Sequence, residues 1–159
     1  MKAQNVGFGE RPKERASAPV KVKKLVGKAC APEQGGFWGD FHTAAQLDPE
    51  LADLKERMLG TLASARAPKT LQKYGSLVRD WESFVEEKGY GAWPVDVALF
   101  LLFLQSRLER AEDLGLRESA VTHYVYAVDF VAKLRGDPQV GLEPRVDLML
   151  AAAKRLLGR

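Results

Sequence analysis

Residues 68–88, PKTLQKYGSLVRDWESFVEEK, decide the fold class of this chain. Apolar residues recur there at three- and four-residue steps, which places them on one face of an α-helix. Proline in the first turn and a glycine just after residue 88 are typical of the two ends of a helix. The stretch therefore predicts a long amphipathic helix. Its inner face is formed by Leu71, Tyr74, Leu77, Val78, Trp81, Phe84 and Val85.

The same periodicity predicts four more helices around this one. Asp48-Pro49, an N-cap candidate followed by proline, begins a helix that ends near Ala65. The others begin at Pro94, near Glu118 and at Pro144. The chain has no alternating apolar run and no two-residue hairpin turn, so we expect no sheet. We predict an all-α fold, a compact bundle of about five helices.

Apolar spacing also predicts how deeply two of these helices are buried. Residues 97–104 are apolar on every side, which indicates the most buried helix of the bundle. Residues 111–116, which include Gly115, are expected to connect it to the next helix. The helix that begins at Asp48-Pro49 is expected to bury a single stripe. This stripe is formed by Leu47, Leu51, Leu54, Met58 and Leu62.

Residues 1–44 are predicted to be a disordered basic tail ahead of a helical domain at residues 45–159. Few large apolar residues in the tail could offset the entropy cost of ordering it. Residues 1–30 hold eight Lys or Arg and two acids, whereas residues 66–159 hold 14 basic and 13 acidic residues. The basic run of the tail could target the nucleus, contact phosphates, or have no dedicated partner. It consists of Lys21, Lys23, Lys24 and Lys28.

Composition argues against several classes of protein. The longest apolar run, residues 97–104, is far shorter than the roughly 20 residues that a membrane span needs. The single cysteine, Cys30, excludes an internal disulfide and suits a reducing compartment. No apolar signal segment occurs in the first 30 residues. We expect an intracellular protein, nuclear if eukaryotic, that does not interact with a membrane.

No cofactor, metal or small-molecule substrate is expected. One cysteine and two widely separated histidines do not make a metal site. Neither GxxxxGK[ST] nor GxGxxG occurs, so no phosphate-binding loop of those types is present in the sequence. Adjacent acids such as Glu86-Glu87 are better explained as a solvated helix face than as a catalytic pair.

The helices, taken in order, resemble the N-terminal, SAM-like core-binding domain of the tyrosine recombinase (phage integrase) family. Residues 67–74, APKTLQKY, with Trp81 and Phe84, resemble its opening S-x-x-T-x-x-x-Y…W/F-x-x-F. Residues 117–121, RESAV, resemble the entry to its second DNA-facing helix. Residues 148–157, LMLAAAKRLL, are similar to the helix before the catalytic domain, most of all in recombinases of DIRS-type retroelements and related animal mobile elements.

Further residues bear on this resemblance. Trp93-Pro94 leads into a leucine-rich helix, and residues 127–134, AVDFVAKL, are similar to a later family segment. Ala67 stands where the family has a small polar residue, and Ala132-Lys133 stands near a common histidine. The resemblance covers residues 45–159.

The resemblance implies that the chain binds double-stranded DNA as one half of a clamp. In that family this domain closes over one face of the duplex, and two of its helices cross the major groove. Phosphate contacts would fix the position and base-edge contacts would carry sequence preference. Carried over to this sequence, the DNA-binding residues are Lys69, Thr70, Lys73, Ser119, Thr122, His123, Tyr126 and Lys133.

Several of these residues have ordinary structural explanations as well. His123 could be a polar residue at the edge of the core, and Tyr126 could belong to the core itself. Lys69 and Lys73 could lie on an ordinary solvent-facing helix. These alternatives stay open on the sequence alone.

No catalytic activity is expected from this chain. The family's reaction needs a tyrosine nucleophile, arginines and a His-x-x-Arg pair. His42 is followed three residues later by Ala45, and His123 by Tyr126, so the pair is absent. The sequence ends at Arg159, where a linker to a catalytic domain would begin. A second copy of the chain or a full-length recombinase is a further expected partner.

One alternative function remains, a helical protein-interaction domain derived from a mobile-element recombinase that has lost DNA binding. It is favoured by the near-neutral charge of residues 66–159, because DNA binding depends on neutralising phosphates. A basic strip on the faces of the second and fourth helices would favour DNA. Scattered charges would favour the interaction domain.

Overall fold

The computed structural model of the chain describes residues 28–30, 37 and 48–158. Five α-helices and one short 3-10 helix have their bounds within these residues, and no β-strand lies among them. The prediction of an all-α bundle of about five helices is confirmed. The elements are α4 (Pro49–Ala63), α5 (Pro68–Glu86), α6 (Val97–Leu114), α7 (Ser119–Arg135), η2 (Val140–Leu142) and α8 (Pro144–Leu157).

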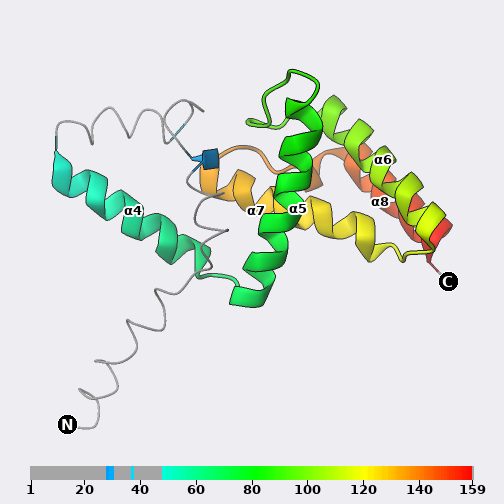
Figure 1. Cartoon of the computed structure of the whole chain (residues 1–159), viewed down its shortest axis with the longest axis horizontal. Coiled ribbons are helices and arrows are strands. Elements are labelled where there is room, and N and C mark those ends of the chain that lie inside the picture. Colours follow the sequence, from blue (N-terminus) through cyan, green and yellow to red (C-terminus); the bar gives the residue numbers. More distant parts are fainter. Residues whose placement is uncertain (1–27, 31–36, 38–47, 159) are drawn as a thin grey trace, which may run out of the picture.

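The core lies where α5, α6 and α7 meet, and Figure 1 shows α5 crossing α7. Trp81 of α5 contacts Phe100 and Phe103 of α6, with ring centroids 5.2 and 5.5 Å apart. Tyr124 of α7 meets the same Phe103 edge-on at 5.0 Å. The side chains of Trp81, Phe100 and Phe103 are fully buried. One aromatic cluster thus joins the three helices and fixes the crossing on which the candidate site depends.

The most buried helix is α7, not α6, so that prediction is wrong. Ten of the 17 residues of α7 are buried, whereas Leu102 in the apolar middle of α6 is 61% exposed. The reason is position: α7 contacts α5, α6, α8 and η2, while α6 leaves one side uncovered. The expected connection at residues 111–116 is also mostly helix. α6 continues to Leu114 and ends at Gly115, whose φ of 67° is left-handed and therefore suits glycine.

The predicted buried stripe of α4 is exposed. Figure 1 shows α4 apart from the crossing of α5 and α7, and only Leu59 and Ala63 of this helix are buried. These two residues pack in a small cluster with Leu71 and Phe130. Leu47 lies outside the described residues. The stripe residues that are described are 37–45% exposed: Leu51, Leu54, Met58 and Leu62.

Three residues of the predicted tail pack against the bundle. Ala29 and Cys30 are buried, and the backbone oxygen of Ala29 accepts a hydrogen bond from Arg135. The expectation of disorder therefore does not hold for residues 28–30. Apart from Phe37, which is exposed, the rest of residues 1–44 lies outside the described residues, including Lys21, Lys23 and Lys24.

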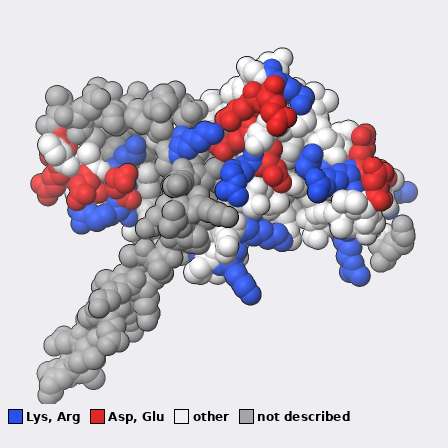
Figure 2. Space-filling model, viewed as in Figure 1, with Lys and Arg blue, Asp and Glu red and all other residues white. Residues whose placement is uncertain are grey.

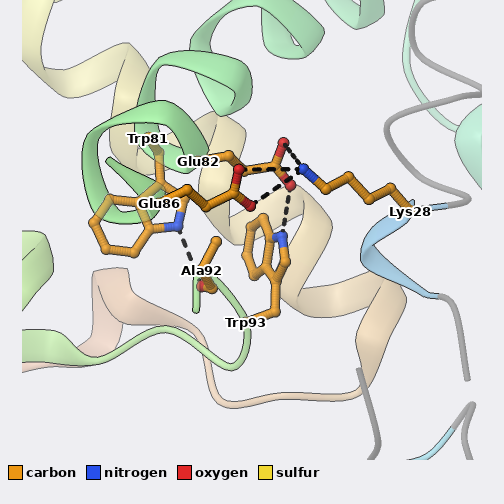
Figure 3. Close-up of polar contacts among 6 residues, drawn as sticks. All are labelled: Lys28, Trp81, Glu82, Glu86, Ala92 and Trp93. Atoms are coloured by element: carbon orange, nitrogen blue, oxygen red, sulfur yellow. Dashed lines mark hydrogen bonds and ion pairs between the residues drawn. The ribbon is translucent and has the colours of Figure 1, made fainter. Parts of the chain in front are cut away.

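Figure 3 shows how the side chain of Lys28 is held. Its Nζ lies 3.2 Å from a carboxylate oxygen of Glu86 and 3.8 Å from one of Glu82. Glu82 is almost completely buried and also accepts a hydrogen bond of 2.8 Å from the indole nitrogen of Trp93. Burial raises the pKa of Glu82, although the Trp93 hydrogen bond and Lys28 act in the opposite direction. Lys28 thus joins the segment at residues 28–30 to the C-terminal part of α5.

None of the helices in the described part of the chain has the length and hydropathy that a membrane span requires.

Candidate nucleic-acid interface

Helices α5 and α7 carry all eight residues that the resemblance marks for DNA contact. On α5, Leu71, Val78 and Trp81 turn to the core, so Lys69 and Lys73 are left exposed one turn apart. Thr70, between them, is half-buried. The spacing of the apolar residues is therefore what directs the two lysines outward.

The crossing of the two helices brings Lys73 and His123 together. The Nζ of Lys73 lies 2.6 Å from Nδ1 of His123, although fifty residues separate them in the chain. A lysine ammonium only donates, so Nδ1 accepts this hydrogen bond and Nε2 carries the proton of a neutral imidazole. Burial, and the positive charge of Lys73, lower the pKa of His123 below its usual 6.5. His123 therefore adds a hydrogen-bond donor to this surface and no positive charge at neutral pH.

The remaining α7 residues extend the surface along the helix. Ser119 is exposed at the first position of α7, and the Thr122 hydroxyl donates to the backbone oxygen of Glu118 at 3.2 Å. Tyr126 is 53% exposed, with its ring centroid 6.0 Å from that of His123. Tyr126 is thus not a core residue, and His123 is only partly buried at the edge of the bundle.

The eight residues do not form one compact group. Lys69 and Thr70 lie about one turn from Lys73 along α5. Lys133 is exposed in the last turn of α7, ten residues from His123 and thus roughly 15 Å along the helix axis. The centre of the surface is therefore formed by Lys73, Ser119 and His123.

A pocket of about 450 Å³ lies beside this centre, between α5, α6 and α7. Lys73, Ser119 and His123 line it together with three arginines that the sequence prediction does not include. They are Arg107, Arg110 and Arg117. Arg107 and Arg110 are three residues apart on α6, and Arg117 comes just before α7. The three-residue spacing of Arg107 and Arg110 places both on one helix face and could have indicated a basic patch from the sequence. The family resemblance, however, points to α5 and α7 alone.

The cations of this pocket have few acidic neighbours. Among the described residues, no carboxylate lies within 4.0 Å of the charged nitrogens of Lys73, Arg107, Arg110 or Arg117. One acid, Asp80, lines the pocket, and its carboxylate accepts a hydrogen bond of 2.8 Å from the Tyr124 hydroxyl. The pocket therefore has a local excess of positive charge.

This excess is local and not part of a broad basic face. Figure 2 shows Lys and Arg in separate groups, with Asp and Glu between them, on the side of the molecule that it draws. That scatter agrees with the near-neutral balance of residues 66–159. Any contact with a polyanion would depend on a few grouped cations.

The described residues contain no group of three or more His, Cys, Asp or Glu side chains placed to hold a metal ion. The buried Cys30 is a poor ligand candidate, because burial raises the pKa of its thiol to about 11.

Comparison of the chain with protein-family models, with curated proteins and with solved structures found no match.

Proposed function

We propose that this chain is a double-stranded DNA-binding module that uses the outer faces of α5 and α7. The observation that carries the proposal is the contact between Lys73 and His123 at 2.6 Å. Two residues that the resemblance marks on separate helices meet at one place on the surface. The resemblance to the core-binding half of a tyrosine recombinase clamp supports the same function, without catalysis by this module itself.

The chemistry of the surface suits such a role. Lys69 and Lys73, one turn apart and both exposed, can meet neighbouring phosphates. Ser119, His123 and Tyr126 offer hydroxyl and imidazole groups that can contact phosphate oxygens or base edges. Exposed helices are also what the major groove of a duplex can admit.

The test is binding of the full chain to a labelled DNA duplex across a salt series. The variant Lys69→Ala/Lys73→Ala removes two cations from the proposed surface. The control Lys154→Ala/Arg155→Ala removes two exposed cations from α8. We expect the first variant to weaken binding at least about tenfold and to reduce the slope of log affinity against log salt by roughly one for each phosphate that is no longer neutralised. The control should keep the affinity and slope of the original chain.

Equal decreases in affinity in the two variants would show only general charge attraction and would contradict the proposed surface. A chain that binds no duplex at low salt would contradict the function itself. Unfolding curves of both variants check that each is folded.

One observation favours the alternative of a helical protein-interaction domain. The apolar stripe of α4 is exposed, and an amphipathic helix with an open apolar face is a common way to contact another protein. A chain without duplex affinity whose Leu54→Lys/Met58→Lys variant changes its sedimentation behaviour would support this alternative. A monomer at all concentrations, with or without these substitutions, would give it no support.

A further inference from the structure

The pocket between α5, α6 and α7 brings together four cationic side chains and one carboxylate. Lys73 comes from α5, Arg107 and Arg110 from α6, and Arg117 from the α6–α7 connection. Elsewhere in the described residues, some cations have a carboxylate partner within 4.0 Å, among them Lys28, Arg57, Arg135 and Arg145. The four pocket cations have none within this distance, so only the Asp80 carboxylate in the lining offsets their mutual repulsion.

The start of α7 adds to the same field. Ser119 and Ala120, the first residues of this 17-residue helix, line the pocket. The N-terminal end of a helix carries a partial positive charge, although the backbone N–H groups of Ala120 and Val121 already donate to the backbone oxygens of Arg117 and Glu118. No acid occupies the first turn of α7, and the side chain of the preceding Glu118 makes no capping hydrogen bond. Glu118 at the N-cap is therefore the one acid at this helix end, and its side chain does not bond to the backbone N–H groups of the first turn.

His123 does not change this balance. Its imidazole is neutral at pH 7, since burial and Lys73 lower its pKa. The Asp80 carboxylate already accepts a hydrogen bond from Tyr124. Four positive charges against one negative charge remain, in a concave site where the surrounding protein strengthens their field.

We infer that this pocket is a phosphate-binding site in which Arg110 and Arg117 supply the principal contacts. A guanidinium presents paired N–H groups that match two phosphate oxygens, and arginines are the residues that recognise phosphate in this way. Both arginines are exposed, so their side chains are accessible to a ligand. Arg107 is half-buried over the ring of Phe103, which holds it at the wall of the pocket.

The phosphate has two possible sources, the DNA backbone and a free phosphate group. The inference rests on the proposed function only where it takes the DNA backbone as the source of the phosphate. On that basis, the pocket extends the DNA surface from α5 and α7 onto α6.

The first arm of the test titrates the full chain with inorganic phosphate at constant ionic strength and follows backbone amide signals by NMR. We expect saturable shifts at residues 117–120 in the original chain and in the control Lys154→Gln/Arg155→Gln. The variant Arg110→Gln/Arg117→Gln should not show them. Shifts that do not saturate, or that persist unchanged in this variant, would overturn the site.

The second arm measures duplex binding of the same three proteins across a salt series. Removal of one interaction with a backbone phosphate should lower the salt slope by about one in the Arg110→Gln/Arg117→Gln variant and leave the control unchanged. Phosphate-dependent shifts without any duplex binding would keep the pocket as a site for free phosphate and would reject the proposed function. Duplex binding with no change in slope, and no phosphate-dependent shifts, would reject the pocket and leave the proposed function standing.

Discussion

At the scale of single residues, Asp129 holds the turn between α7 and α8. Its two carboxylate oxygens accept hydrogen bonds from the backbone N–H groups of Val140 and Gly141, at 2.6 and 2.9 Å. A Cβ on Gly141 would lie 2.6 Å from one of these oxygens, so any other residue there would require the carboxylate to shift. This carboxylate therefore fixes η2 and the start of α8.

We expect Asp129→Ala to lower the free energy of unfolding by about 1–3 kcal/mol, because two partly buried donors are left without their acceptor. Urea unfolding measures the change. The control Asp113→Ala removes an exposed acid from the last turn of α6 and should stay within about 0.5 kcal/mol of the original chain. Equal effects in the two variants would contradict the role of Asp129.

Glu82 gives a pH dependence whose sign follows from its burial. Its pKa in the folded chain is raised above the usual 4.5. At a pH between the pKa of Glu82 in the unfolded chain and its higher pKa in the folded chain, the folded state binds more protons than the unfolded state. The free energy of unfolding therefore falls as the pH rises through this range. Glu82→Gln keeps an acceptor for Trp93 and cannot ionise. We expect the variant to become more stable relative to the original chain as pH rises from 4.5. A stability difference that stays flat between pH 4 and pH 8 in urea unfolding would contradict this.

The candidate site illustrates what a sequence can indicate residue by residue. Lys69 and Lys73 are predicted correctly as neighbours on one exposed helix face, because helical spacing alone sets that relation. The contact of Lys73 with His123 depends on where α5 crosses α7, which local spacing does not determine. The grouping of Arg107, Arg110 and Arg117 with Lys73 depends on how α6 packs against α5 and α7, which local spacing does not determine either.

At the scale of elements, α4 and α7 differ in how much tertiary packing holds them. Ten residues of α7 are buried, against two of α4. We expect amide protons of α4 to exchange with solvent at least about a hundredfold faster than those in the middle of α7, because a poorly buried helix opens without global unfolding. Native-state hydrogen exchange measures both helices in one sample. Equal protection would show that α4 opens only with the whole bundle.

The helices also show why burial is harder to predict from sequence than the position of an element. Starts at Pro49, Pro68 and Pro144 match because proline and the capping residues act locally. An apolar stripe indicates which face of a helix can be buried, but not whether another element covers it. The stripe of α4 and the all-round apolar middle of α6 are therefore both less buried than their sequences predict.

At the scale of the whole molecule, the formal net charge of +3 says little about where an anion would bind. On the side of the molecule that Figure 2 draws, Lys and Arg lie in separate groups, with Asp and Glu between them. A binding surface made of a few grouped cations predicts a modest salt slope, smaller than that of a protein with a continuous basic face. Duplex binding across a salt series measures this slope directly.

The docking of residues 28–30 gives the molecule a reporter of its own. Cys30 is the single cysteine of the chain and is 1% exposed, and the pKa of its thiol is raised to about 11. A thiol-reactive reagent can modify Cys30 only when this segment separates from the bundle or when α4, whose Leu59 and Ala63 lie in the same cluster as Cys30, opens, because the thiol is otherwise buried and protonated. The rate of labelling thus counts the opening events of the small cluster in which Cys30 is buried. The unmodified protein already carries the probe with which the attachment of its N-terminal segment can be timed.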